Sequence, residues 1–566
     1  MTQQPARSTP VYRISDDFVE RFAALDPLAA TSMGVSGHDA EMTDFSPDGL
    51  AARHELQRES AAALRVAPVE DEADRIARDV MVERLDLAFE MYAANTHLYE
   101  LNILHSPTQS IRSSFDLMPR ANSDDWANIA ARLRAVPDAL AGVRATLEHG
   151  AAQGLLAAVR QCRGVAQQCD VYGGAREGQR SFFHGLLDAY EASPPGNDHL
   201  GREIAAAADI AAAAYLEHGC YLVDDYLPRA TPQDPVGRES YQLRSRAFNG
   251  IELDLDETYA WGWEELWRIQ AEMSEVAGRI KPGADAAGAI DMLDTDPDRA
   301  IEGEEPFRQW MQDLQDDTIA SFDGVHFDIP EPVRRIEAMI APPGGALAMY
   351  YTGPSEDFSR PGRTWYPTGG HTRFPLWREV SIAYHEGVPG HHLQIAQTRY
   401  LGDTLSRYQR LLAGTSGYAE GWALYAERLM AELGYLDNPD HYMGLLCSQA
   451  LRAVRVVIDI GMHLELEIPQ QEAYHPGETW TPELALPFLM QRSYFPADML
   501  ASEVDRYLGM PGQAISYKVG ERIWLASREE ARARAGAAFD LKAWHTAALN
   551  LGPMGLAQMQ RELATI

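Results

Sequence analysis

The sequence predicts a mainly α-helical protein that carries a small β-sheet in its second half. Most of the first 320 residues repeat apolar side chains at the spacing of amphipathic helices. Between about residues 325 and 370, short alternating or aromatic runs are separated by proline and glycine, a pattern typical of strands and turns. We therefore expect an N-terminal helical half, residues 1–320, and a C-terminal half, residues 321–566, within one continuous fold.

Local signals place the helices of the first half. Apolar periodicity or high helix propensity predicts helices over 70–105, 123–135, 137–150, 155–170 and the alanine-rich 202–227. Asp16 or Asp17 is expected to cap a first short helix, and Asp254 or Asp256 a later long one, because a side-chain oxygen before the first turn satisfies free backbone N–H groups.

Three segments before residue 370 are predicted strands, namely 332–340, 346–353 and 363–369. An edge strand of the resulting sheet could hold an extended peptide by main-chain hydrogen bonds. The same sheet could instead simply cover the helix that follows it, and the sequence leaves both interpretations open.

Charge and composition exclude several classes of function. The formal net charge is −34, from 49 basic and 83 acidic side chains, so nucleic acid and anionic membranes are poor partners. Solubility is the simpler explanation of this charge, and a preference for cationic substrates is the alternative. No apolar run approaches a membrane span and the start does not resemble a signal peptide, so we expect a cytoplasmic protein.

The cysteines do not form a recognisable framework. The four of them stand far apart without a CxxC pair, which predicts reduced and mostly buried thiols: Cys162, Cys169, Cys220 and Cys447. Nothing in the composition indicates an oligomeric state.

The stretch HEGVPGHH, residues 385–392, carries the clearest chemical signal. In the zinc motif HExxH, a helix brings two histidines four residues apart onto one face, and the intervening Glu acts on a water molecule. Here the fourth residue after His385 is Pro389, and the next histidines are His391 and His392. Glu386 occupies the position of the general base.

The spacing requires a break in the helix. Six residues of ideal helix turn by about 600°, which puts His391 nearly opposite His385, and His392 lies about 10 Å along the axis. Proline and glycine disrupt helices, so Pro389 and Gly390 could act as a two-residue insertion. We therefore prefer His391 as the second metal ligand and keep His392 as the alternative.

A third ligand is expected on the helix predicted over 415–434. Glu420 lies in its first turn, where an acidic residue can also simply favour the helix dipole. Its neighbours include Tyr418 and Trp422, an unusual setting for a solvated carboxylate. A His, His, Glu set with one open position is typical of catalytic zinc. Glu427 could support a ligand or pair with Arg428 at the surface.

The next predicted helix, 441–467, places four polar residues along one face: Arg452, Arg455, Asp459 and His463. They could form a ladder of ion pairs, Arg455 with Asp459. Alternatively, Asp459 could orient a zinc-bound imidazole while His463 lines the cleft.

A last polar segment, 502–525, carries Arg506, Tyr507, Gln513, Tyr517 and Lys518. Pro511 is expected to start a helix there, on which Gln513 and Tyr517 would share a face.

Four motifs in this order resemble one bacterial family. HEGVPGHHLQ, GYAEGWALYAE, RAVRVVIDIGMH and RYLGMPGQAISYKVG are similar to domain-of-unknown-function family 885, and LDPLAATSMGVSGHD near the start is similar to that family's opening. The family is placed among gluzincin-type zinc peptidases. The resemblance implies a large helical zincin-like fold related to Taq carboxypeptidase, thimet oligopeptidase and angiotensin-converting enzyme, with a deep cleft between two helical halves.

The resemblance also implies roles for individual residues. By position, His385, His391 and Glu420 would hold one Zn²⁺ ion and Glu386 would be the general base. By analogy with the relatives' downstream Tyr and His, Tyr517 is the first choice and His463 the second for stabilising the oxyanion.

The expected function is a zinc-dependent hydrolase that cleaves peptide bonds in short peptides, as a carboxypeptidase or dipeptidase does. Arg506 or Lys518 would hold a terminal carboxylate, with Tyr507 and Gln513 as further substrate-binding residues. The alternatives are a metal-dependent amide hydrolase or tailoring enzyme for a small metabolite, and a non-catalytic helical binding protein. Manganese, cobalt or nickel could replace zinc in such a ligand set.

Overall fold

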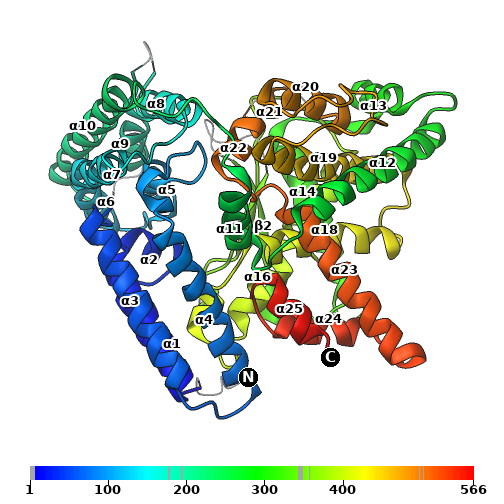
Figure 1. Ribbon diagram of the computed structural model, residues 1–566, viewed down its shortest axis with the longest axis horizontal. Coiled ribbons are helices and arrows are strands. Elements are labelled where there is room, and N and C mark those ends of the chain that lie inside the picture. Colours follow the sequence, from blue (N-terminus) through cyan, green and yellow to red (C-terminus); the bar gives the residue numbers. More distant parts are fainter. Residues whose placement is uncertain are drawn as a thin grey trace. The chain divides into compact units, whose positions relative to one another are not determined.

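The computed structural model describes residues 7–175, 179–192, 195–341, 349–355, 357–495, 497–500 and 502–566. The chain is mainly α-helical, as predicted (Figure 1). It divides into two compact units: an N-terminal unit, residues 8–236 with 508–510, and a C-terminal unit, mainly residues 237–507 and 511–566. The division thus falls near residue 236, whereas residue 320 was expected.

The N-terminal unit is built from helices, and an apolar core joins buried side chains from Leu28 and from the segment between Leu101 and Ala230. Its elements are α1 (Pro10–Leu25), α2 (Pro27–Met33), α3 (Pro47–Val66), α4 (Glu72–Ala93), the 3₁₀ turn η1 (Thr96–Tyr99), α5 (Pro107–Leu117), α6 (Ser123–Arg134), α7 (Val136–Ala151), α8 (Val159–Gly173), α9 (Phe182–Ala192), α10 (Asp198–Tyr221) and the π-helical turn η2 (Leu222–Tyr226). Small buried side chains such as Ala207 and Ala211 let α10 pack against α6 and α8.

The predicted helices of this unit are confirmed, with two differences. The segment 70–105 is helical only to Ala93 and continues as η1. The first helix is longer than expected, because Thr9 caps it by accepting a hydrogen bond from the Tyr12 backbone N–H and a proline follows at its first position. The predicted caps Asp16 and Asp17 therefore lie inside α1.

The C-terminal unit holds the remaining elements. Its helices are α11 (Gly237–Asn249), α12 (Leu255–Ile280), α13 (Ala286–Thr295), η3 (Pro297–Arg299), α14 (Glu304–Phe322), η4 (Glu331–Arg334), α15 (Glu379–Glu386), α16 (His391–Tyr400), α17 (Arg407–Leu411), α18 (Ser416–Glu432), α19 (Pro439–Leu464), α20 (Pro482–Ser493), α21 (Ala497–Leu500), α22 (Glu503–Gly509), α23 (Ser516–Ala535), η5 (Gly536–Ala538), α24 (Leu541–Asn550) and α25 (Leu556–Leu563). Asp254 caps α12 as predicted, whereas α23 begins at Ser516 and not at Pro511.

Two helix pairs organise this unit. α12 packs along α19, which explains why residues 237–320 group with the C-terminal half, and α18 packs along α23. The second pair approaches closely because Gly421 faces Gly520: a Cβ on Gly421 would lie 2.4 Å from the Gly520 Cα. The helix that carries Glu420 is thereby fixed against the helix that carries Tyr517.

The predicted strands form a small sheet that precedes α15. Its order is β2 (Ile336–Ile340), β4 (Gly362–Tyr366), β3 (Tyr350–Thr352), with β2 parallel and β3 antiparallel to β4. A separate antiparallel pair joins β1 (Ala300–Glu302) to β5 (Arg373–Pro375). The first part of the predicted segment 346–353 lies outside the described residues.

The helix α19 runs through the interior of the C-terminal unit. Every residue of it from Met443 to His463 is buried, so its polar face meets protein and not water. The expected ion pair between Arg455 and Asp459 does not form. Arg455 pairs with Glu503 at 2.8 Å, and Asp459 accepts a hydrogen bond from Tyr241.

Two further sequence expectations can be compared with the described residues. No helix among them has both the length and the apolar character needed to cross a bilayer. All four cysteines are free, and three of them are buried: Cys162, Cys169 and Cys447.

Candidate metal centre

The helix breaks between the first two histidines of HEGVPGHH. α15 ends at Glu386 and α16 begins at His391. The chain between them turns back onto α15, because Gly390 donates its backbone N–H to the Tyr384 carbonyl at 3.1 Å. The Val388–Pro389 peptide bond is cis. The break that the spacing required is therefore present, and it lies at the predicted proline and glycine.

Glycine is needed at position 390 because the backbone passes very close to α15. A Cβ there would lie 2.0 Å from the carbonyl oxygen of His385. The turn is also tied to α18, since the buried indole of Trp422 donates to the carbonyl of Pro389 at 2.8 Å. These contacts carry His391 back toward His385.

His385, His391 and Glu420 meet at one point. The Nε2 atoms of both histidines lie 3.4 Å from the same Glu420 oxygen, Oε2, and the two rings stand at 85° to each other. Among the described residues these three form a group whose candidate ligand atoms all lie within 4.8 Å of one another. The predicted ligands are therefore brought together from α15, α16 and α18.

The contacts among these three side chains are not hydrogen bonds. Glu420 Oε2 is buried and has no hydrogen-bond partner within the described residues. Donor atoms bound to tetrahedral zinc at about 2.0–2.1 Å lie roughly 3.3 Å apart, which matches the 3.4 Å separations. The donor set and its spacing therefore fit a divalent ion of zinc's size.

His392 points away from this group. Its Nε2 donates to the Val333 carbonyl at 2.7 Å, and its Nδ1 lies 2.9 Å from the Tyr351 hydroxyl, which can donate to it. Both ring nitrogens are thus in use, and burial lowers the His392 pKa to about 4. It is His391, the preferred residue, that faces Glu420.

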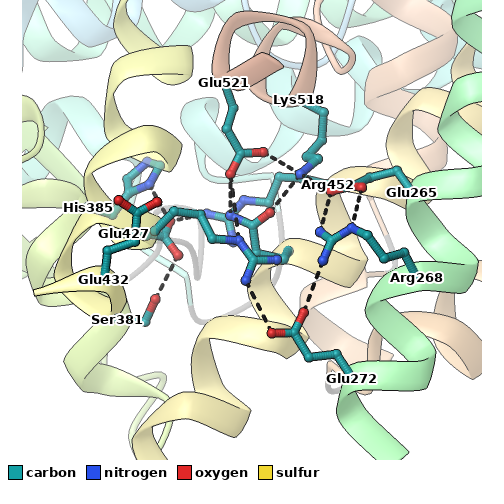
Figure 2. Close-up of polar contacts among 12 residues, drawn as sticks. Glu265, Arg268, Glu272, Ser381, His385, Glu427, Glu432, Arg452, Lys518 and Glu521 are labelled. Carbon is teal, nitrogen blue, oxygen red and sulfur yellow. Dashed lines mark hydrogen bonds and ion pairs between the residues drawn. The ribbon is translucent and has the colours of Figure 1, made fainter. Parts of the chain in front are cut away.

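Glu427 supports His385 from behind. One of its oxygens accepts from His385 Nδ1 at 2.7 Å, and the other accepts from the Ser381 hydroxyl at 2.6 Å (Figure 2). A proton held at Nδ1 leaves the Nε2 lone pair free for a metal, which is how carboxylates commonly orient histidine ligands. Glu427 therefore holds the position that had been considered for Asp459.

The electrostatics of the cluster favour a cation at its centre. Burial opposes protonation of His385, but Glu420 and Glu427 outweigh it and raise the His385 pKa to about 9. Burial likewise opposes ionisation of Glu420, yet the two histidines hold its pKa well below the usual value. Negative charge from two carboxylates is thus concentrated around the two imidazoles.

Glu386 lies next to this group and is almost completely buried, with 6% of its surface exposed. Burial raises its pKa, and the nearby His385 and His391 offset this only in part. Its carboxylate forms no hydrogen bond with the described part of the chain. A buried carboxylate without a protein partner, beside a candidate metal site, can exchange a proton with water.

Tyr517 stands over the first histidine. Its ring centroid lies 6.5 Å from that of His385 in a stacked arrangement, and the guanidinium of Arg455 lies 4.7 Å from the Tyr517 ring centroid. Burial and the charge of Glu420 raise the Tyr517 pKa, so the hydroxyl keeps its proton. The structure therefore places the Tyr517 ring beside the candidate ligand His385, and the predicted role of its hydroxyl stays a prediction.

His463 and Asp459 form a separate buried group. His463 is fully buried and its Nε2 donates to the Tyr507 carbonyl at 3.1 Å. Asp459 Oδ2 accepts from the Tyr241 hydroxyl at 2.8 Å and from the Gly512 backbone N–H at 3.0 Å. The contacts of both residues are with this group, not with the candidate ligands, so His463 is not positioned as the predicted oxyanion donor.

Three of the predicted substrate-binding residues hold one another. Arg506 donates to Gln513 at 2.7 Å and forms two hydrogen bonds with Glu503. Tyr507 also donates to Glu503, and Gln513 donates to Ser416 at the start of α18. Glu503 therefore neutralises the charge of Arg506, and the side chains of Tyr507 and Gln513 already have hydrogen-bond partners within the protein.

Lys518 is buried in a polar cluster of its own, with 2% of its surface exposed. Its ammonium donates to Glu265 at 2.8 Å, to Gln449 at 2.7 Å and to Glu521 (Figure 2). A lysine ammonium has three donors, and all three are used here. Lys518 is thus not available to a substrate.

Sequence reasoning missed the supporting role of Ser381 and left that of Glu427 open. Two spacings in the sequence indicate these supporting roles. Ser381 precedes His385 by one helical turn, and Glu427 follows Glu420 by two, so each pair shares a helix face.

A family model described as a bacterial protein of unknown function, DUF885, matches residues 27–563. A search of curated proteins found no match. Two solved structures are similar over 98% of this chain: a "putative lipoprotein" from Colwellia psychrerythraea (21% identity, 98% of that chain, TM-score 0.85) and a "putative lipoprotein of unknown function" from Shewanella oneidensis (18% identity, 99% of that chain, TM-score 0.73). At these identities the likeness concerns the fold alone. The family match spans nearly the whole sequence, and the chain therefore belongs to the DUF885 family.

Proposed function

We propose that this protein is a metal-dependent hydrolase that cleaves peptide bonds in short peptides, with one zinc ion held by His385, His391 and Glu420. The observation that carries the proposal is the meeting of two imidazole nitrogens on one unpartnered carboxylate oxygen. A buried polar group without a partner is costly unless something else satisfies it.

The residues around the three ligands divide the remaining tasks. When bound, zinc supplies Lewis-acid activation of a water molecule and of the substrate carbonyl. Glu427, itself held by Ser381, keeps a proton on His385 Nδ1 and fixes the direction of that ring.

Glu386 is assigned the proton transfer. It takes a proton from the attacking water, the water oxygen bonds to the peptide carbonyl carbon, and the C–N bond breaks as Glu386 delivers the proton to the leaving amine. Tyr517, whose ring stacks over His385, donates a hydrogen bond from its hydroxyl to the oxygen that becomes negative during attack.

We also infer a zincin-like fold of the gluzincin type, with a substrate cleft at the three ligands. What supports this is the order of the elements: a small sheet, a helix with the His-Glu pair, and the acidic ligand on a later helix. The proposal extends to the DUF885 family, because the four motifs that resemble it include the three ligands together with Glu386, Glu427 and Tyr517.

Metal analysis and a matched variant test the proposal. Protein purified without chelators should contain about one zinc ion per chain, lose activity on treatment with a chelator and regain it with zinc. Glu386→Gln should keep the metal and lose hydrolysis by at least about 100-fold, the contribution typical of a general base. Full activity in Glu386→Gln would remove Glu386 from the mechanism.

The alternative classes give different outcomes in the same preparation. A metal-dependent amide hydrolase would hold the ion but prefer N-acyl amino acids to a peptide library. A non-catalytic binding protein would contain no stoichiometric ion and would hydrolyse neither. Manganese, cobalt or nickel in place of zinc would change the metal and leave the residue assignments intact.

A further inference from the structure

The basic side chains of α19, α22 and α23 differ in how many of their donors already have a hydrogen-bond or ion-pair partner in the protein. Lys518 uses all of its donors within its own cluster. Arg506 and Arg455 share Glu503 as their ion-pair partner, and Arg455 also donates to a tyrosine hydroxyl. Arg452 is the exception.

Arg452 is buried, with 9% of its surface exposed, and lacks the hydrogen bonds of its neighbours. Its Nε is buried without a partner, and its nearest carboxylate oxygen, Oε1 of Glu427, lies 3.9 Å from Nη2, beyond hydrogen-bonding distance. Within the described residues this guanidinium forms no hydrogen bond, although it offers five donors.

Its position relates it directly to the proposed reaction site. The Arg452 guanidinium lies 5.8 Å from the centroid of the Tyr517 ring, which stacks over His385. The same Glu427 oxygen lies 2.7 Å from His385 Nδ1 and 3.9 Å from Arg452 Nη2, so Glu427 links the two on the side of the imidazole away from Glu420 (Figure 2). A positively charged group with unused donors therefore lies one side chain away from a candidate metal ligand.

We propose that Arg452 binds the C-terminal carboxylate of the substrate, so that the enzyme removes residues from the carboxyl end of short peptides. This inference rests on the proposed peptidase function. A carboxylate offers two oxygens in the geometry that a guanidinium binds, and it would satisfy donors that the protein leaves unused. The role had been expected of Arg506 or Lys518, which protein carboxylates already occupy.

The reaction then releases the last residue of the peptide. The water oxygen bonds to the carbonyl carbon of the preceding residue, the C–N bond breaks, and the water proton passes through Glu386 to the nitrogen of the departing amino acid. That amino acid keeps the carboxylate bound to Arg452. A peptide whose terminus is an amide presents no negative charge to the guanidinium.

A comparison of free-acid and amidated substrates tests the proposal. The peptide cleaved best in a library is prepared with a free C-terminus and as its C-terminal amide, and kcat and KM are measured for both. The wild-type enzyme should prefer the free acid by at least about tenfold in kcat/KM, because a charge-assisted hydrogen bond is lost with the amide. This measurement needs no variant.

Variants then assign the preference to Arg452. Arg452→Gln should raise KM for the free acid by about tenfold or more and change the amide by less than about twofold, whereas Arg452→Lys should restore part of the preference. Arg455→Gln is the matched control: this arginine contacts the same tyrosine ring but is paired with Glu503, so the acid-to-amide ratio should stay as in the wild type.

The outcomes separate this inference from the function on which it rests. Equal cleavage of acid and amide by the wild type, or equal losses for both in Arg452→Gln, would overturn the role of Arg452 and leave the peptidase proposal standing. A metal-loaded wild type that cleaves neither form would contradict the proposed function, and this inference with it.

Discussion

Two buried polar clusters of the C-terminal unit differ in how their donors and acceptors are paired. In the first, the closed cluster, Lys518 donates to Glu265, Gln449 and Glu521, and Gln449 also donates to Glu521. In the second, the open cluster of His385, His391 and Glu420, the atoms that face one another form no hydrogen bonds.

Burial alone therefore does not distinguish a structural cluster from a functional one. Burying a polar group is costly unless it has a hydrogen-bond partner, and in the closed cluster the chain itself supplies those partners. The open cluster is satisfied only if something outside the chain binds to it. Behind His385 the chain supplies the partners, since Glu427 accepts a hydrogen bond from His385 Nδ1 and Ser381 donates to Glu427. Glu420 Oε2 and His391 Nδ1 are buried without a partner among the described residues.

The largest difference is expected when one member of the open cluster is removed. Glu420→Gln keeps the shape of the side chain and removes its charge, so metal affinity should fall by at least about 100-fold and hydrolysis should be lost. Inductively coupled plasma mass spectrometry after dialysis measures the metal. Retention of a full equivalent in this variant would contradict the role of Glu420.

For the closed cluster we expect a loss of stability without a loss of metal. Lys518→Met removes the cation and leaves Glu521 and Glu265 short of a buried partner, so the free energy of unfolding should fall by about 3–5 kcal/mol. Urea denaturation at pH 7 measures this, and the metal content of the folded variant should equal that of the wild type. A loss of metal without a loss of stability would contradict the distinction between the clusters.

A smaller effect on metal binding is expected from Glu427, which contacts the open cluster through His385 Nδ1. Glu427→Gln retains a hydrogen-bond acceptor for His385 Nδ1 but removes the negative charge, which should weaken metal binding by about 10- to 100-fold without abolishing it. Competition with a chelating dye gives the affinity. A variant that binds the metal as tightly as the wild type would show that the carboxylate acts only through packing.

The smallest effect concerns a buried acid outside both clusters. Burial raises the pKa of Asp459 to about 7, although hydrogen bonds from Tyr241 and Gly512 and the charge of Arg506 act in the opposite direction. The folded state then binds more protons than the unfolded state between about pH 4 and 7, so stability should fall as pH rises through this range.

Asp459→Asn should flatten that dependence, and at pH 8 the variant should be more stable than the wild type by about 2 kcal/mol. Chemical denaturation at pH 5 and pH 8 provides the comparison, with His463 at 3.7 Å as the neighbouring group that could share the proton. A wild-type protein that is equally stable at both values would show that Asp459 is ionised throughout.

Local patterns were sufficient to predict most of the helices, the strands and the open cluster. The break at Pro389 and Gly390 follows from backbone chemistry, and the choice of His391 follows from counting residues across that break. Glu420 could be found because a carboxylate among aromatic side chains is unusual on a helix.

What the sequence could not predict depends on partners that are distant along the chain. Lys518 was expected to face a substrate, but Glu265, 253 residues earlier, accepts its hydrogen bond. His463 was expected at the reaction site, but the packing of α19 and α22 commits it to the Tyr507 carbonyl. A motif identifies chemically capable residues, and only the folded chain determines which of them remain unpaired.

Anomalous diffraction from crystals soaked in zinc would test the central claim most directly. We predict one strong peak per chain, bonded at about 2.0–2.2 Å to Nε2 of His385, Nε2 of His391 and an oxygen of Glu420. A map without a peak at these three atoms, in crystals where zinc is bound elsewhere, would contradict the proposal that the open cluster is a metal site.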